Sequence, residues 1–147
     1  MADDGASVTD PAVVVDASVW IAAFTRDEPV HATSARFLAT AMARGTPVVL
    51  PAMTRIEIGC AIARRRGGDT AERALGQLDA LPGITRLAAD RIAPDAALTC
   101  GVRLRLRTLD AFLVAATIAT GARLVTWDAE LLERAGAITP TAWLDAD

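Results

Sequence analysis

The sequence predicts an α/β fold in which a short, mostly parallel sheet is covered by helices on both faces. Short runs rich in Val, Leu and Ile alternate with longer segments of helical periodicity along the 147 residues. Strands that are apolar throughout are expected to be buried on both faces. Alternation of strands and helices favours parallel pairing, because each helix returns the chain to the same end of the sheet.

Length and composition fit one domain of ordinary size. Of the 147 residues, 52% are hydrophobic and 4% aromatic, so the core must consist mainly of aliphatic side chains. We expect a disordered tail over residues 1–11, which are polar and acidic, and one domain over residues 12–147. The start lacks a secretory pattern, and the longest apolar stretch, residues 111–119, is too short for a membrane span. We therefore predict a cytoplasmic protein with no membrane association.

The order of elements follows from apolar runs and from the residues that interrupt them. Gly45, Gly67 and Gly121 mark helix ends, and Asp69 is expected to cap the helix that follows it. Strands are predicted over residues 12–15, 47–50, 84–87 and 123–126, with an edge strand at 138–139. Helices are predicted over residues 17–24, 30–43, 51–66, 69–81, 90–104, 108–120 and 128–135.

The two cysteines, Cys60 and Cys100, do not form a disulfide framework or a zinc motif. Both lie in apolar stretches, which predicts buried and reduced thiols. Reduced thiols agree with a cytoplasmic location. The lone His31 is expected to be a surface residue at a helix start and not a metal ligand.

Four acidic residues lie near the predicted carboxyl ends of strands, where the functional sites of α/β folds are usually found. Asp16 directly follows the first strand, and Asp128 follows the fourth strand. Glu57 lies near the start of the helix after the second strand, and Asp110 lies in the first turn of its helix. Ligands of such folds bind outside the carboxyl ends of the strands, so all four carboxylates are expected to converge on one edge.

Each acid also has a simpler structural explanation. Asp16 and Asp128 could be helix N-caps, Asp110 could serve the helix dipole, and Glu57 could be a solvated helix residue. The apolar neighbours of Asp110 and Glu57 argue against this, because a charged group at an apolar position needs a partner. The chain has no Lys to supply one, since all 15 of its basic residues are Arg.

A hard divalent cation would resolve the repulsion among four carboxylates. Oxygen ligands without His or Cys suit Mg²⁺ or Mn²⁺ better than Zn²⁺. Such a site is suited to phosphodiester hydrolysis, because the cation activates water and offsets charge in the transition state. The net charge of −3 argues only weakly against a nucleic-acid substrate, since bound cations would neutralise these acids.

The four acidic segments together resemble PIN domains. The matching segments, in order, are residues 13–20 (VVVDASVW), 55–59 (RIEIG), 109–116 (LDAFLVAA) and 124–128 (LVTWD). The resemblance implies a PIN-like three-layer fold with Asp16, Glu57, Asp110 and Asp128 as catalytic metal ligands. It also implies that Ser18 and Thr126 orient the carboxylates; the alternative for both hydroxyls is local bonding to the backbone.

A compact chain of this kind is most similar to VapC-type toxins of type II toxin–antitoxin systems. That similarity implies an Mg²⁺- or Mn²⁺-dependent endoribonuclease that cleaves structured RNA such as tRNA or rRNA. It further implies a homodimer and a cognate antitoxin protein that blocks the active site.

Arginines near the acids are the candidates for RNA binding. Arg103, Arg105 and Arg107 alternate before the Asp110 helix, and an extended segment would place all three on one face. With Arg55 they could guide the RNA backbone, since the guanidinium fork binds phosphate bidentately. The alternative is a solvated loop. The run of residues 64–66 (RRR) is assigned to the dipole at a helix end.

Other functions fit the sequence less well. A dehalogenase-type phosphatase and a response-regulator receiver both need a Lys, which this chain lacks. A DNA-directed flap or repair nuclease usually has a longer chain. The serious alternative is a catalytically silent PIN-like module that binds RNA or serves as a scaffold, although the complete set of four acids argues against it.

Overall fold

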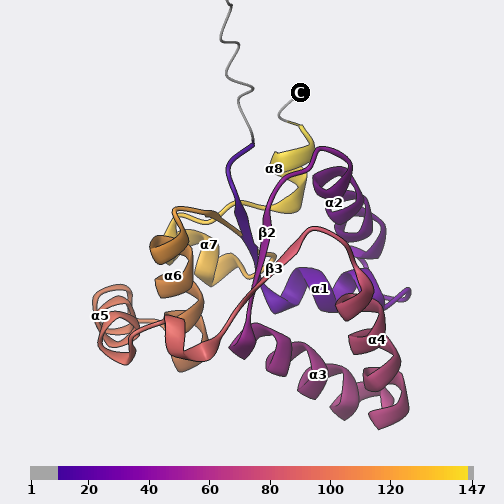
Figure 1. The fold of residues 1–147 in the computed structure, drawn as a ribbon, viewed down its shortest axis with the longest axis horizontal. Coiled ribbons are helices and arrows are strands. Elements are labelled where there is room, and N and C mark those ends of the chain that lie inside the picture. The colour runs from indigo at the N-terminus through magenta and orange to yellow at the C-terminus, as the bar shows by residue number, and fades with distance from the viewer. Residues whose placement is uncertain (1–9, 146–147) are drawn as a thin grey trace, which may run out of the picture.

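The computed structural model describes residues 10–145, and it has the predicted α/β architecture (Figure 1). Its four strands are parallel and lie in the order β3-β2-β1-β4. The first elements are β1 (Val13–Val15), α1 (Ala17–Phe24), α2 (His31–Ala43), β2 (Val48–Pro51), α3 (Ala52–Arg66) and α4 (Gly68–Ala80). The remaining ones are β3 (Ile84–Leu87), η1 (Ala89–Arg91), α5 (Pro94–Leu104), α6 (Thr108–Thr120), β4 (Arg123–Val125), α7 (Ala129–Ala135) and α8 (Pro140–Leu144).

Alternate strand residues enter two separate cores, one on each face of the sheet. Val13 and Val15 pack with Trp20 of α1 and Phe37 of α2, and the same core includes side chains of α3 and α4. Val14 packs on the opposite face against α6 and α7. Figure 1 shows these two groups of helices on either side of the strands. The arrangement is three-layered, as the sequence predicted.

Most element boundaries agree with the sequence prediction, and the exceptions have local causes. Gly67 has a φ of 88°, which ends α3, and α4 begins at once with Gly68. Asp69 therefore lies within the first turn of α4, and the prediction that it caps the helix is wrong. Positive φ at this junction favours glycine, because a Cβ would be strained there.

The predicted helix over residues 90–104 is divided in two. A short 3₁₀ turn, η1, is followed by an extended Ala93 with ψ of 128° and then by α5 from Pro94. A residue before proline is pushed out of the helical region, which explains the break. Pro94 then occupies the first turn of α5, where its missing N–H costs nothing.

The predicted edge strand at residues 138–139 is reduced to one parallel bridge between Val125 and Ile138. The next residue, Thr139, instead caps α8 by accepting a hydrogen bond from the Ala142 N–H at 3.2 Å. The Thr139–Pro140 pair is an N-cap followed by an N1 proline, so the sequence contained a signal for α8 that was missed.

The cysteine prediction is also wrong in part. Cys60 is exposed and Cys100 is partly buried. The buried face of α3 is formed by Thr54, Ile58 and Ile62, spaced four residues apart, and Cys60 lies between them on the opposite face.

No helix within residues 10–145 is long and apolar enough to cross a membrane.

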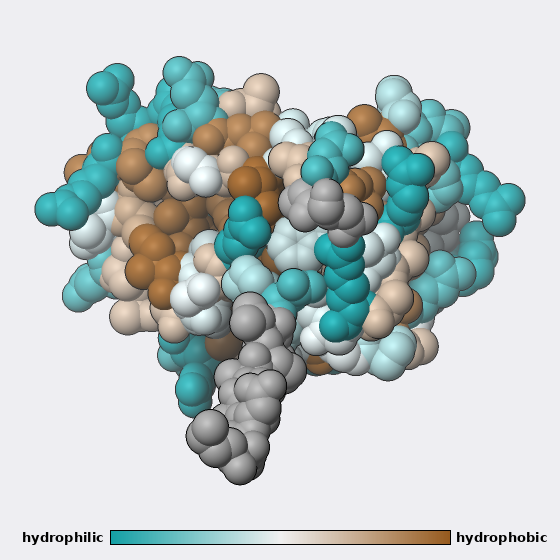
Figure 2. All heavy atoms as spheres, turned by 90° about the horizontal axis from the view of Figure 1, so that it is seen from above, coloured by the Kyte–Doolittle hydropathy of each residue, from teal (hydrophilic) through white to brown (hydrophobic). Residues whose placement is uncertain are grey.

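Several large apolar side chains are exposed at the α5–α6 end of the molecule. Leu98, Val102 and Ile118 are each more than half exposed. Figure 2 shows the molecule from above, with apolar areas mainly on the left of the view and hydrophilic side chains among them. Single exposed apolar residues are common on protein surfaces, so they carry no functional assignment by themselves.

Candidate active site

The structure brings all four predicted acids to one cleft of about 600 Å³. Asp16 follows the end of β1, and Asp128 follows β4 after two intervening residues. Glu57 comes from α3 and Asp110 from the first turn of α6. Parallel pairing of β1 and β4 places their carboxyl ends side by side, which is why residues 112 positions apart in the chain meet here.

Asp16 is held by two hydroxyl groups. Its Oδ2 accepts hydrogen bonds from Ser18 Oγ at 2.8 Å and from Thr126 Oγ1 at 2.7 Å. The residue occupies the N-cap position of α1 but makes no capping hydrogen bond with its side chain. With only 6% of its surface exposed, Asp16 is a buried carboxylate directed into the cleft. The N-cap explanation therefore does not account for it.

Asp128 is the N-cap of α7, one of the explanations considered from the sequence, and it also lines the cleft. Its Oδ1 accepts hydrogen bonds from the backbone N–H groups of Glu130 and Leu131 at 2.9 and 3.1 Å, so it caps α7. Its Oδ2 accepts a hydrogen bond from Arg107 Nη2 at 3.0 Å. The cap fixes one oxygen, while the other is bound by Arg107.

Glu57 and Asp110 have raised pKa values. Burial raises the pKa of Glu57 to about 7, with further contributions from the charges of Asp16 and Asp110 and an opposing effect of Arg107. The pKa of Asp110 is also raised, chiefly by burial; Arg107 lowers it, while Asp16 and Asp128 raise it. Charge repulsion from neighbouring carboxylates thus adds to burial in raising both pKa values.

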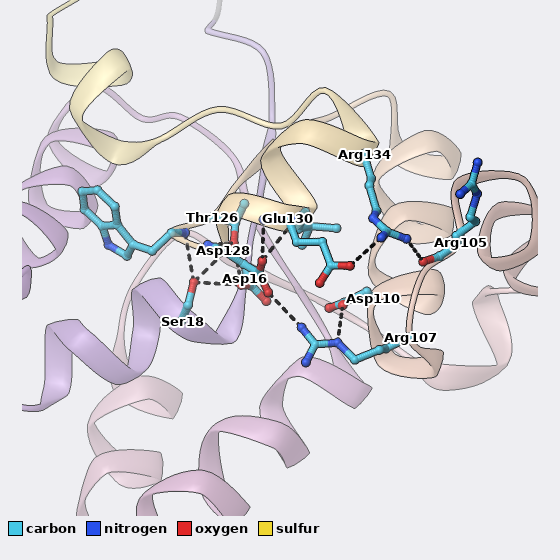
Figure 3. A network of polar contacts seen from close by, with 11 residues as sticks. Asp16, Ser18, Arg105, Arg107, Asp110, Thr126, Asp128, Glu130 and Arg134 are labelled. Carbon is cyan, nitrogen blue, oxygen red and sulfur yellow. Dashed lines mark hydrogen bonds and ion pairs between the residues drawn. The ribbon is translucent and has the colours of Figure 1, made fainter.

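Arg107 lies among these acids and contacts two of them (Figure 3). It occupies the N-cap position of α6 and directs its guanidinium toward the cleft. Nε lies 3.4 Å from Asp110 Oδ2, and Nη2 lies 3.0 Å from Asp128 Oδ2. The guanidinium therefore bridges an acid in the first turn of α6 and the acid that caps α7.

The other arginines proposed for RNA binding lie in different surroundings. Arg103 is part of α5, and Arg105 ends that helix with a left-handed φ of 54°, so the predicted extended segment is wrong. Figure 3 shows the Arg105 side chain directed away from the acids, while its carbonyl oxygen accepts a hydrogen bond from Arg134. Arg55 binds Asp79 of α4 through Nε at 3.0 Å and Nη2 at 2.7 Å.

Arg65 and Glu28 are cleft residues that the sequence analysis did not assign to the site. Arg65 lines the cleft and forms an ion pair with Glu28 at 3.2 Å, whereas the sequence assigned it only to the helix dipole. Glu57, Ala61 and Arg65 recur every four residues on α3 and all line the cleft. This helical spacing was the signal that could have placed Arg65 beside the acid. His31 begins α2 as predicted, with Nδ1 2.9 Å from the Ala22 carbonyl oxygen.

The donor set fits a hard divalent cation. Within residues 10–145, no three His, Cys, Asp or Glu side chains are already arranged to hold a metal ion. The cleft nevertheless gathers four carboxylates whose mutual repulsion and burial raise two of their pKa values. Oxygen donors of this kind suit Mg²⁺ or Mn²⁺.

Comparison with known proteins agrees with this architecture. The family model described as PIN domain matches residues 13–137, which is most of the chain. The chain belongs to the PIN-domain family. All four acids lie within the matched PIN segment. No curated protein matches the sequence significantly.

Several solved structures show the same fold at low sequence identity. VapC20 of Mycobacterium tuberculosis, described as a sarcin-ricin loop cleaving toxin, is 18% identical with a TM-score of 0.68; the match covers 83% of this chain and 94% of VapC20. PAE2754 of Pyrobaculum aerophilum is 23% identical with a TM-score of 0.67, covering 99% and 96%. VapBC2 of Rickettsia felis, bound to a DNA fragment from its promoter, is 11% identical with a TM-score of 0.64, covering 87% and 96%.

Proposed function

We propose that this PIN-domain protein is an Mg²⁺- or Mn²⁺-dependent endoribonuclease. The observation that carries the proposal is the convergence of Asp16, Glu57, Asp110 and Asp128 on one cleft at the carboxyl edge of the sheet. These four side chains would hold the cation and serve as the catalytic residues. Carboxylate sites that bind Mg²⁺ commonly complete the coordination with water and substrate phosphate, which suits phosphodiester hydrolysis.

The residues of the chain have separable tasks in such a reaction. When bound, the cation supplies an activated water and offsets the charge that develops on the phosphate. Ser18 and Thr126 keep Asp16 in one orientation, while the N-terminal backbone of α7 does the same for Asp128. Glu57 must lose its proton to become a ligand, so cation binding is coupled to proton release.

Arg107 and Arg65 are the basic side chains placed to bind the RNA backbone, because both line the cleft that holds the acids. They replace Arg55, Arg103 and Arg105 as the leading candidates. None of these three arginines is part of the cleft lining, and Arg55 binds Asp79 of α4 instead. Arginine forks suit phosphate oxygens.

We further propose that the enzyme is the toxin of a type II toxin–antitoxin pair and acts in the cytoplasm on tRNA or rRNA. The names of the structural relatives VapC20 and VapBC2 support this proposal, as does the description of VapC20 as a loop-cleaving toxin. On this proposal the protein forms a homodimer and binds a small cognate antitoxin. The alternative is a catalytically silent PIN-like module that binds RNA or serves as a scaffold.

Cleavage of a mixture of total tRNA and rRNA tests the proposal. Wild type and Asp16→Asn are compared with Mg²⁺, with Mn²⁺ and with EDTA. Discrete fragments that need the cation and disappear in the variant are expected. Asparagine retains an oxygen acceptor for Ser18 and Thr126, so loss of cleavage in this variant reports loss of the charge. Absence of cleavage under all conditions, or equal cleavage by Asp16→Asn, would favour the silent module.

A further inference from the structure

The guanidinium of Arg107 lies between acids that the proposed function assigns to a cation. We infer that Arg107 is a resident counter-ion: it neutralises Asp110 and Asp128 while the cation is absent and turns to an RNA phosphate when the cation is bound. The inference rests on the proposed function and deepens it, because it names the residue through which cation loading and RNA binding are coupled. Figure 3 shows the Arg107 bridge to the two acids.

The geometry supports the first of these two states. Asp110 and Asp128 approach the same guanidinium through Nε at 3.4 Å and Nη2 at 3.0 Å. Their side chains are only 17% and 28% exposed, so water alone screens their repulsion poorly. A positive charge between them removes part of that repulsion. Arg107 thus does for the free protein what a cation would do for the loaded one.

The exposure of Arg107 supports the second state. Its side chain is 73% exposed, so it is not fixed by packing and can change partners without disturbing the core. A divalent cation among the carboxylates would repel the guanidinium at this distance. The Arg107 guanidinium would then extend from the rim of the cleft, and its N–H groups would be free to bind another anion. A phosphate oxygen of RNA is the anion that such a fork binds best.

This exchange predicts opposite effects of one substitution on two ligands. Arg107→Gln removes the competitor for the carboxylates, so Mn²⁺ should bind more tightly. The same change removes a phosphate contact, so RNA should bind more weakly. A residue that merely supported the local structure would weaken both.

Calorimetric titration of the full chain with Mn²⁺ gives the decisive measurement. Arg107→Gln is expected to bind Mn²⁺ more tightly by a factor on the order of ten, because a positive charge beside the site has been removed. The matched control is Arg103→Gln, which makes the same change in net charge on α5 outside the cleft. Its Mn²⁺ affinity should equal that of wild type. Arg107→Lys keeps the charge without the fork and should also remain near wild type.

RNA binding is measured in Mg²⁺ with a labelled 2′-O-methyl oligonucleotide of mixed sequence, since phosphate contacts do not depend on sequence. Arg107→Gln should reduce the slope of log affinity against log salt by about 1, and Arg103→Gln should not change it. If wild type cleaves RNA and binds Mn²⁺, but Arg107→Gln binds Mn²⁺ with the same affinity as wild type, the inference about Arg107 is wrong and the proposed function stands. A wild type that binds no Mn²⁺ would overturn the proposed function and this inference with it.

Discussion

Thr126 Oγ1 donates a 2.7 Å hydrogen bond to Asp16 Oδ2 and thereby joins the ends of β1 and β4. The same hydroxyl accepts a hydrogen bond from the backbone N–H of Asp128 at 3.0 Å. Thr126 is completely buried, so neither bond competes with water. One side chain therefore fixes the positions of two acids relative to each other, and the pairing of Val15 with Val125 brings them together.

Replacing this hydroxyl by a methyl group tests its importance. Thr126→Val keeps the shape but leaves the Asp128 N–H without its acceptor and removes one of the two hydroxyl donors to Asp16. We expect a loss of about 1–3 kcal/mol in the free energy of unfolding, the usual penalty for buried groups left without partners. RNA cleavage should fall as well, because Asp16 is less well oriented. Urea denaturation and a cleavage assay measure the two effects.

Thr126→Ser is the matched control, since it retains the hydroxyl and loses one methyl group. It should keep most of the cleavage rate at a small cost in stability. If Thr126→Val cleaves RNA as fast as Thr126→Ser, the hydroxyl does not position the acids for chemistry.

Two substitutions of Asp128 separate the contribution of its helix cap from that of its negative charge. Asn caps helices about as well as Asp, so Asp128→Asn should keep the free energy of unfolding within about 0.5 kcal/mol of wild type. Asp128→Ala loses the hydrogen bonds to the Glu130 and Leu131 N–H groups and should cost about 1 kcal/mol more. Both variants should lose RNA cleavage. Full cleavage by Asp128→Asn would remove this residue from the proposed set of cation ligands.

The packing of α5 on α6 supports the acid in the first turn of α6. A Cβ on Gly101 would lie 3.1 Å from the Cβ of Ala111, the residue next to Asp110. Gly76 in α4 offers the matched comparison, because a Cβ there would meet open space. Gly76→Ala should raise the free energy of unfolding by roughly 0.5–1 kcal/mol through helix propensity. Gly101→Ala should gain less than that or lose stability, because two helices must separate slightly. Thermal denaturation of both variants measures this difference. An equal increase in the stability of both variants would show that α5 can move away from α6 without a loss of stability.

The sequence predicted the layers and the location of the acids for reasons that are visible in the structure. The strands are short and apolar, and α1, β3 and α6 begin and end at the predicted residues because glycines and polar residues delimit them. The convergence of Asp16 and Asp128 followed from parallel pairing, which requires no knowledge of side-chain contacts. Sheet topology was therefore enough to predict that Asp16 and Asp128 lie near each other.

The arginines could not be placed in the same way. Alternation of Arg103, Arg105 and Arg107 resembles a strand, but the left-handed φ of Arg105 ends a helix at that point. Local sequence rarely predicts this conformation for a residue other than glycine. Arg55 lies only two positions from Glu57, yet its partner Asp79 comes from α4, 24 positions away. Ion pairs between helices depend on packing that periodicity does not reveal.

Glu57 should make the stability of the cation-free protein depend on pH. Its pKa rises from 4.5 to about 7 in the folded protein, first through burial and then through Asp16 and Asp110, against an opposing effect of Arg107. Between pH 4.5 and about pH 7, Glu57 is therefore protonated in the folded state and ionised in the unfolded state. The associated stability is fully present below pH 4.5 and is lost as the pH rises through 7. We expect a loss of about 1–2 kcal/mol after allowance for solvent in the open cleft.

Glu57→Gln separates this contribution from all other titrations, because Gln resembles the protonated acid and does not ionise. Urea denaturation in EDTA at pH 5 and pH 8 should show a smaller decline in the variant than in wild type. Asp110 changes in the same direction and leaves part of the decline in both proteins, since its pKa is also raised. Excess Mg²⁺ should stabilise wild type at pH 8 more than it stabilises Glu57→Gln, because the variant lacks one carboxylate ligand. Equal declines in the two proteins would mean that Glu57 is already ionised at pH 5 in the folded protein.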